Sequence, residues 1–420
     1  MIPHIGPIRL EFVIFALTLV GVALFHTKTM YVALSGLLSV LIFKWLFIPD
    51  FSLFAHIVGG HGHEGEWRTL VNITGLLFGF AILAKHFEES KVPELLPNYI
   101  PDGYWGAVAL LFFVMVVSSF LDNIAAAMIG GTIALAVFQG RVHIGYLAAI
   151  IAASNAGGAP SVVGDTTTTL MWIDGVSPVD VLHAFWGSAG AFLVFGFIGA
   201  YQQHRYQPIQ SDAAPGIRLD LGRLLIVVLI LALAIVTNWA MDFPAIGVWV
   251  AILIGTAFRK TPWSEFRKSW QGTVFLVSLV LCASLMPVEL LPTACWMTTC
   301  GLGFVSAVFD NIPLTKLCLL QGGYDWGMLA YTVGFGGSMI WFGSSAGVAL
   351  SNQFPEIRSV PQYLKHGWHV TVAFIVGFAV LMAVAGWQPH PPHKSIPTAK
   401  ATSFQMDKAS MAKSVSSASM

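Results

Sequence analysis

The chain has 420 residues, of which 56% are hydrophobic and only 10% are charged, and its mean hydropathy is +0.74. A soluble globular protein carries about 25% charged residues, so this composition excludes a soluble enzyme and also a disordered chain. Lysine plus arginine and aspartate plus glutamate number 21 each, so no net charge is present to attract nucleic acid. The composition predicts an all-α polytopic membrane protein.

Apolar segments long enough to cross a bilayer recur along the whole chain, since a spanning helix needs about 20 residues. They lie at residues 5–25, 30–48, 69–86, 104–138, 145–172, 180–202, 222–240, 243–258, 271–291, 293–322, 325–350 and 366–386. No basic region precedes the first segment, so we expect a retained span and not a signal peptide.

A histidine cluster lies between the second and third of these segments. It contains His56, His61 and His63, with Glu64 and Glu66 nearby. A weak surface metal site is one interpretation, but no other residue organises the cluster. A polar, glycine-rich loop is the favoured interpretation.

Two of the apolar segments are too long for one helix, and each has an aspartate near its middle. Asp122 divides 104–138, and Asp310 divides 293–322. We interpret both as re-entrant helical hairpins that enter the membrane and return to the same side. The prediction is then about ten transmembrane helices plus two hairpins.

The distribution of basic residues predicts the orientation. With the N-terminus outside, the inside loops carry most of the lysines and arginines from Lys28 to Lys365, whereas the short outside loops carry only Arg68. That asymmetry follows the positive-inside rule and holds only if both hairpins return to their own side. The polar tail after Gly386 would then lie outside.

The two halves of the chain share sequence patterns in the same order. Ser118–Ala125 resembles Ser306–Pro313, and Gly157–Asp165 resembles Gly336–Ser344. On the predicted topology the two hairpins enter from opposite sides, which indicates the inverted-topology repeat of secondary transporters. The predicted division is N-terminal helices and outer loop 1–68, first repeat 69–202, cytoplasmic linker 203–223, second repeat 224–386 and disordered polar tail 387–420.

Glycines break one helix in each half. Glycine and proline destabilise a helix interior by about 1 and about 3 kcal/mol, and a broken backbone at membrane depth frees carbonyls that suit a small cation. Asp165 can cap the second half-helix, and we expect Thr167 and Thr168 to face the site, although threonines in membrane helices also serve helix packing. The predicted breaks are at Gly157, Gly158, Gly164, Gly336, Gly337 and Gly343.

Three buried carboxylates are the candidate ion carriers: Asp122, Asp165 and Asp310. Ionised residues at membrane depth are rare and mostly functional. One such carboxylate can hold a proton or a sodium ion but not both, which is the requirement for exchange. An asparagine follows each hairpin aspartate, and its amide can donate to the carboxylate or offer an oxygen to the ion. Capping of a half-helix is the alternative role.

The second half lacks an aspartate at its break. Ser338, Ser344 and Ser345 surround that break instead, so the predicted site is asymmetric. Lys316 lies six residues after Asp310 in an apolar run. It could pair with Asp310 or take part in coupling, but we favour a side chain that snorkels to the interface.

These motifs resemble the NhaD-type sodium/proton antiporters of the ion transporter superfamily over roughly residues 65 to 385. The resemblance rests on Phe120–Asn123, on Asn155–Ala159 and Gly164–Thr168, and on Asp310–Pro313 and Gly336–Ala349. Thr166 departs from the valine expected after the motif aspartate. The ion- or proton-binding residues that the resemblance implies are Asp122, Asn123, Asn155, Asp165, Thr167, Thr168, Asp310, Asn311 and Ser344.

The resemblance implies exchange of cytoplasmic sodium or lithium for external protons, with a role in pH homeostasis. It also implies a multi-pass protein of the bacterial inner membrane, a homodimer, and motion of a unit that carries the hairpins and broken helices. Membrane lipid and the transported Na⁺ (or Li⁺) and H⁺ are the expected partners, with no cofactor and no other metal.

Two other functions are alternatives. A transporter of dicarboxylates, citrate or arsenite is the alternative within the same superfamily, but three carboxylates would repel an anion. An intramembrane enzyme is disfavoured because the sequence has no HExxH motif, no paired Gly-x-Gly-Asp motif and no evident Ser-His pair. The prediction is therefore a transporter and not an enzyme.

Overall fold

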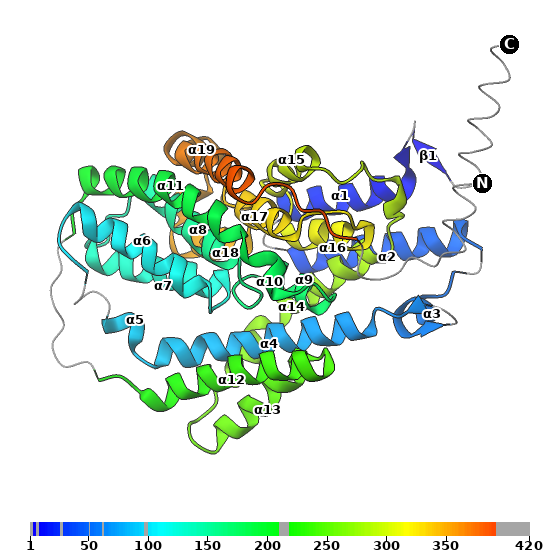
Figure 1. The fold of residues 1–420 in the computed structure, drawn as a ribbon, viewed down its shortest axis with the longest axis horizontal. Helices are drawn as coiled ribbons and strands as arrows, with labels where there is room; N and C mark the ends of the chain where they lie inside the picture. The colour runs from blue at the N-terminus through cyan, green and yellow to red at the C-terminus, as the bar shows by residue number, and fades with distance from the viewer. Residues whose placement is uncertain are drawn as a thin grey trace, which may run out of the picture.

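A computed structural model describes residues 3–5, 8–25, 28–49, 51–60, 63–95, 100–209 and 218–391 (Figure 1). The helices of the first half are α1 Leu10–Leu24, α2 Thr29–Phe47, α3 Leu53–Val58, α4 Trp67–Glu89, α5 Val92–Leu95, α6 Tyr104–Ser118, α7 Asn123–Val137, α8 Ile144–Gly158, α9 Thr166–Ile173, α10 Pro178–Leu182 and α11 Ala184–Tyr206. Those of the second half are α12 Leu221–Met241, α13 Pro244–Thr256, α14 Ser264–Ser284, η2 Val288–Leu290, α15 Trp296–Ser306, α16 Asn311–Gln321, α17 Trp326–Gly336, α18 Ser345–Gln353, η3 Pro355–Arg358 and α19 Val360–Val384.

The prediction of a helical multi-pass membrane protein is confirmed. Five helical segments in the described residues are long and apolar enough to cross a membrane, and several shorter apolar helices accompany them. The described strands are two short antiparallel hairpins, β1 His4–Ile5 with β2 Ile8–Arg9, and β3 Gly59–Gly60 with β4 His63–Glu64. The number of spans and the re-entrant character of the hairpins stay predictions.

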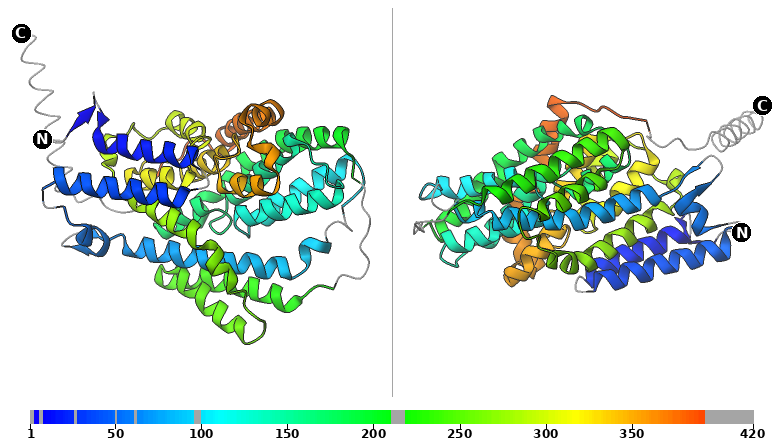
Figure 2. Two further views of the ribbon diagram at one scale, coloured as in Figure 1. Left: turned by 180° about the vertical axis from the view of Figure 1, so that it is seen from behind. Right: turned by 90° about the horizontal axis from the view of Figure 1, so that it is seen from below.

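The helices pack as two bundles. The first, which we call the flanking bundle, contains α1, α2, α4, α12, α13 and α14. The second, the site bundle, contains α6 to α9, α11 and α15 to α19. Helices α4, α12 and α13 lie along the bottom of Figure 1, and α6, α7, α8, α11 and α19 lie above them. Figure 2 shows α1 and α2 side by side at one edge of the molecule. The bundles meet where α14 packs on α16 and α4 packs on α9.

Each long apolar segment is interrupted in its middle. The segment 104–138 forms α6 and α7, with Asp122 immediately before α7, and 293–322 forms α15 and α16, with Asp310 immediately before α16. The segments with glycine clusters form α8 and α9, and α17 and α18. Helices α8 and α17 are the centre of the site bundle, because all residues of α17, and all of α8 after its first, are buried.

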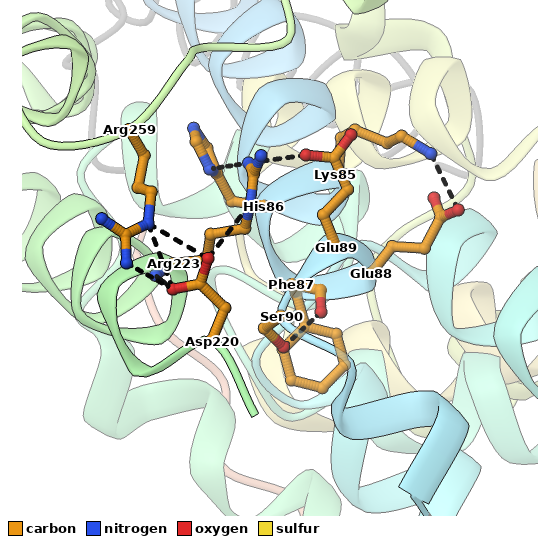
Figure 3. Close-up of polar contacts among 9 residues, drawn as sticks. All are labelled: Lys85, His86, Phe87, Glu88, Glu89, Ser90, Asp220, Arg223 and Arg259. Carbon is orange, nitrogen blue, oxygen red and sulfur yellow. Dashed lines mark hydrogen bonds and ion pairs between the residues drawn. The ribbon is translucent and has the colours of Figure 1, made fainter. Parts of the chain in front are cut away.

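Charged residues join the ends of α4, α12 and α13 in the flanking bundle (Figure 3). The Arg223 guanidinium lies 2.6 Å from Glu89 Oε2 and donates to His86 Nδ1 at 3.1 Å. Arg259 donates to both carboxylate oxygens of Asp220 at 3.0 Å, and these hydrogen bonds hold the pKa of Asp220 below its ordinary value. These contacts bring together basic residues that the topology prediction places on the inside face.

Another ion pair lies within the flanking bundle, between the start of α1 and the end of α2. Lys44 Nζ lies 2.9 Å from Glu11 Oε2, and Arg9 also pairs with Glu11. Lys44 and Glu11 are both buried. A buried carboxylate needs such partners because its desolvation is otherwise unfavourable.

Candidate ion-binding site

Asp165 lies at the centre of the candidate site, between the two halves of its broken helix. Its backbone is extended and its Oδ1 accepts a hydrogen bond from Thr167 N at 3.1 Å, so it is the N-cap of α9. The expected capping role is therefore present, and it uses one carboxylate oxygen. The side chain is 1% exposed, which removes it from bulk solvent.

A chain of amide groups connects Asp165 to the second half of the protein. Asn123 Nδ2 lies 3.1 Å from Asn155 Oδ1 and 3.4 Å from Asp165 Oδ1. Asn155 Nδ2 in turn donates to Ser338 Oγ at 2.9 Å. All four side chains are buried, and they come from α7, α8, the first break and the second break. The hydrogen bonds fix the amide orientations and hold oxygen atoms around one point.

Several oxygens at this point have no hydrogen-bond partner among the described residues. They are Asp122 Oδ1, Asp165 Oδ2 and Thr167 Oγ1. Buried polar atoms are nearly always satisfied, so these three oxygens require an explanation. Oxygen atoms of carboxylates and hydroxyls are the ligands that hard cations prefer. A bound cation or a proton would satisfy them.

Asp122 also reaches the contact between the bundles. It lines a small cavity with Ile73, Leu76, Leu77 and Phe80 of α4 and with Val163, Thr166 and Thr169. The cavity is therefore apolar on the α4 side and carries oxygen atoms on the site side. Asp165 lies within electrostatic range of Asp122 and also of Asp310.

The second half places its predicted residues in corresponding positions. Asp310 Oδ1 accepts from Ile312 N at 3.0 Å and caps α16, and Ser344 Oγ accepts from Gly347 N at 3.3 Å and caps α18. Asn311 is buried in the first turn of α16. Ser344 thus takes the capping position that Asp165 has in the first half, but it does not join the amide chain. The structure brings Asn123, Asn155 and Asp165 into direct contact and leaves Ser344 as a cap.

Matching hydrogen bonds recur in the two halves. Ser118 Oγ donates to Ser154 O at 2.5 Å, and Ser306 Oγ donates to Val333 O at 2.7 Å. Each bond joins the end of the first hairpin helix to the helix that leads into the break. This is the pattern expected of a structural repeat, and it agrees with the sequence alignment of Ser118 with Ser306.

Glycine is required at the breaks because the backbone approaches itself there. A Cβ on Gly158 would lie 2.7 Å from Gly164 O, and a Cβ on Gly337 would lie 2.7 Å from Gly343 O. Real Cβ atoms do not approach this closely, so any side chain would force the broken helix open. The other predicted break positions are crowded by the backbone of the hairpins: Gly157 and Gly164 lie against α6, Gly336 lies against α15, and Gly343 lies against Ala307, immediately after α15.

The threonines after Asp165 have different roles. Thr167 Oγ1 is unpartnered within the described residues, as noted above. Thr168 Oγ1 instead donates to Ser161 O at 2.5 Å and lies 3.0 Å from Asp165 O, which fastens the loop of the break. Thr166 Oγ1 lies 3.4 Å from Asp165 Oδ1, so the departure from the expected valine adds a hydroxyl beside the carboxylate.

Lys316 does not snorkel, so that prediction is wrong. Its side chain is fully buried, and its Nζ lies 2.9 Å from Glu66 Oε2 and 3.3 Å from Asp174 Oδ1. Snorkelling requires a path from the side chain to the interface. Helix α16 offers none, because it packs against α9, α14 and α17. Two carboxylates supply the compensation that interfacial water would have given.

The histidine cluster lies partly outside the described residues. His61 is not described, and only the backbone is described for His63 and Glu64. His56 Nε2 lies 2.9 Å from Ser284 Oγ. Among the described residues, no group of three or more His, Cys, Asp or Glu side chains is arranged to hold a metal ion.

Two residues of the site were not in the predicted set. Ser338 completes the amide chain, and Gly334 lies opposite Asp165, where a Cβ would be 3.0 Å from Asp165 Oδ2. Aligning Gly336 with Gly157 also aligns Gly334 with Asn155. The sequence repeat therefore indicated that Gly334 could belong to the site. The sequence places Ser338 beside the second break. Its hydrogen-bond partner, Asn155, lies in the other half of the chain, so no local sequence pattern indicates the contact.

Comparison with known proteins gives related antiporters. No family model matches the chain. The chain is 26% identical to "Sodium/proton antiporter 1" of Arabidopsis thaliana, over 79% of this chain and 62% of that protein. It is 26% identical to "Na(+)/H(+) antiporter NhaD" of Alkalimonas amylolytica, over 66% of this chain and 68% of that protein. The protein of the same name in Vibrio parahaemolyticus is 25% identical to this chain, over 63% of this chain and 78% of that protein.

The chain spans under two thirds of the plant relative's length. The relatives are named as antiporters, which are transporters and not enzymes, and they come from bacteria and from a plant. NhaD antiporters of further bacteria match at about the same identity. Similarity to several NhaD antiporters at about 25% identity thus supports the resemblance to the NhaD-type sodium/proton antiporters.

Proposed function

We propose that the protein exchanges cytoplasmic Na⁺ (or Li⁺) for external H⁺ by competition between the two ions at buried carboxylates. The observation that carries the proposal is the group of unpartnered oxygens on Asp122, Asp165 and Thr167, held in place by the Asn123–Asn155–Ser338 chain. Sodium would use Asp122 and Asp165 as its charged ligands. A proton on either carboxylate would supply the missing partner when sodium leaves.

Electrostatics favours a cation over an anion in this site. Asp165 lies within electrostatic range of both Asp122 and Asp310, and none of the three forms an ion pair with a described residue. An isolated ionised carboxylate is unfavourable in a low-dielectric interior, so each one must bind a cation or take up a proton. A dicarboxylate or arsenite substrate would add negative charge to this group.

The two-fold arrangement completes the proposal. We propose that residues 69–202 and 224–386 are inverted repeats, joined by the linker 203–223, and that α6–α7 and α15–α16 are hairpins entering from opposite sides. The site bundle would carry the ions past the flanking bundle. The Asp310 carboxylate would add a further proton site, with Asn311 and Ser344 closing the second half.

Sodium-induced proton movement in everted membrane vesicles tests the proposal. We expect wild type to move protons on addition of NaCl, and Asp122→Asn and Asp165→Asn to lose the exchange, because asparagine keeps the shape of the side chain but cannot ionise. Retention of full exchange by both variants would show that the carboxylates are not the carriers. Transport driven by a dicarboxylate, with no response to sodium alone, would establish the anion transporter instead.

A further inference from the structure

The buried ion pair of Lys316 lies between the two bundles. Its Nζ contacts Glu66, immediately before α4, at 2.9 Å and Asp174, immediately after α9, at 3.3 Å. Helices α9 and α16 belong to the site bundle and α4 belongs to the flanking bundle. The contact with Asp174 is therefore internal to the site bundle, whereas the contact with Glu66 crosses from one bundle to the other.

The ion pair lies to one side of the carboxylate cluster. Asp310 caps α16 at the site, and Lys316 follows six residues later. At about 1.5 Å per residue, it lies roughly 9 Å further along the helix. The cavity that reaches Asp122 is lined by α4 and by residues of the first break and α9, and the ion pair joins α4, α9 and α16. The pair thus closes one end of the contact between the bundles.

The proposed topology assigns this end to the external side. Residue Arg68 beside the start of α4 is outside, and the opposite end of α4 carries Glu89, which pairs with Arg223 on the inside face. The shared lysine brings the start of α4 and the end of α9 to one level. In the topology predicted from the basic residues, the start of α4 and the end of α9 are both external. Their contact through Lys316 agrees with that topology.

We propose that the Lys316–Glu66 contact is an external gate, closed in this conformation, which separates when the carboxylate site opens to the outside. This inference rests on the proposed exchange function. An ion pair suits a gate because its charges are hydrated when it opens. Hydration of the separated charges offsets most of the lost attraction. Separating this pair therefore costs much less free energy than separating two charges that remain buried away from water. Asp174 stays with Lys316 in the site bundle and keeps the lysine charge compensated while the bundles move.

The test compares Lys316→Met with a variant that neutralises all three residues, K316M/E66Q/D174N. Both lose the gate, but only the first leaves two carboxylates without their lysine. Half-saturation for Na⁺ is measured on both faces, in everted and in right-side-out vesicles. If the gate favours the closed state about tenfold, its loss raises the outward-open fraction from about one tenth to about one half. Apparent affinity then improves about fivefold for external Na⁺ and weakens about twofold for cytoplasmic Na⁺.

A matched control is Lys44→Met. Lys44 is also buried and paired with a carboxylate, but its partner Glu11 lies in the same bundle. This variant should lower thermal stability and leave both half-saturation values unchanged. A change of the same sign on both faces in the Lys316 variants would make Lys316 a part of the ion site and overturn the gate. So would unchanged affinities on both faces with only a loss of stability.

A second measurement does not depend on transport. Amide hydrogen exchange of the purified protein should be faster in the first turn of α4 and along α16 in the K316M/E66Q/D174N variant, with α12 and α13 unchanged as the internal reference. Equal exchange in variant and wild type would refute the gate. Absence of sodium-dependent proton movement in wild type would instead refute the proposed function, and the exchange measurement would still decide whether the contact opens.

Discussion

Replacement of Asn155 by alanine tests the organisation of the ion site without removing a charge. Asn155 is fully buried in α8 and links Asn123 on one side to Ser338 on the other, so it connects the two halves of the protein. Alanine keeps the helix, because it is the best helix former. It removes the amide that orients Asn123 beside Asp165.

The expected magnitude follows from the bonds that are lost. Two hydrogen bonds disappear, at 3.1 Å to Asn123 and 2.9 Å to Ser338. Each contributes about 0.5–1.5 kcal/mol net, so the total is about 1–3 kcal/mol. A factor of ten in affinity corresponds to about 1.4 kcal/mol. If roughly half of the loss falls on the ion-bound state, about 0.5–1.5 kcal/mol, the Na⁺ half-saturation concentration rises about two- to tenfold.

The assay is sodium-induced proton movement in everted vesicles, over a range of Na⁺ concentrations, with the thermal stability of the purified protein measured in parallel. Asn72→Ala is the matched control, because Asn72 is also buried and accepts a hydrogen bond from Ala245 N at 3.2 Å, but in the flanking bundle. The control should lose stability and keep its half-saturation value. A folded Asn155→Ala variant with wild-type half-saturation would refute the assigned role of the amide chain.

Three further predictions concern single positions. Gly334→Ala places a Cβ 3.0 Å from Asp165 Oδ2, so the carboxylate must shift by a few tenths of an ångström. We expect weaker Na⁺ affinity with little loss of thermal stability. Unchanged affinity would contradict the position assigned to Oδ2. Asp310→Asn keeps an oxygen to cap α16 and should fold normally. It should release fewer protons per Na⁺ bound, as measured with a pH-sensitive dye. Unchanged proton release would show that this carboxylate takes no part in the exchange. Asp220→Asn should lower the melting temperature at neutral pH, because Arg259 lowers the pKa of Asp220 in the folded protein. A lowered pKa stabilises the fold above the ordinary value of about 4, and the benefit is lost as the pH falls through the lowered value. Melting curves of both proteins should therefore converge in acid and in high salt, and a difference that persists there would contradict the ion pair as its cause.

The local interruptions of the helices were predictable from residue types. The penalty for glycine inside a helix and the isolation of Asp122 and Asp310 in apolar runs are both local properties. Helices end and begin within a few residues of these positions in the structure. The cap at Asp165 was likewise visible in its position before the threonines.

Contacts between distant segments could not be predicted in this way. Lys316 meets Glu66 and Asp174 across 250 and 142 residues, and no periodicity in α16 indicates which side chains will surround it. Its burial reverses the expected role, from a charge at the interface to a charge between two bundles. The contact of Asn155 with Ser338 spans 183 residues and is equally invisible in a local pattern.

The central claim is that sodium and protons compete for the same carboxylates. The most direct measurement is calorimetric titration of the purified protein with NaCl at several pH values, in buffers of different ionisation enthalpy. Sodium affinity should fall as the pH falls, and binding should release protons in wild type but not in a variant that combines Asp122→Asn with Asp165→Asn. Sodium affinity that is independent of pH, with no proton release on binding, would contradict the account.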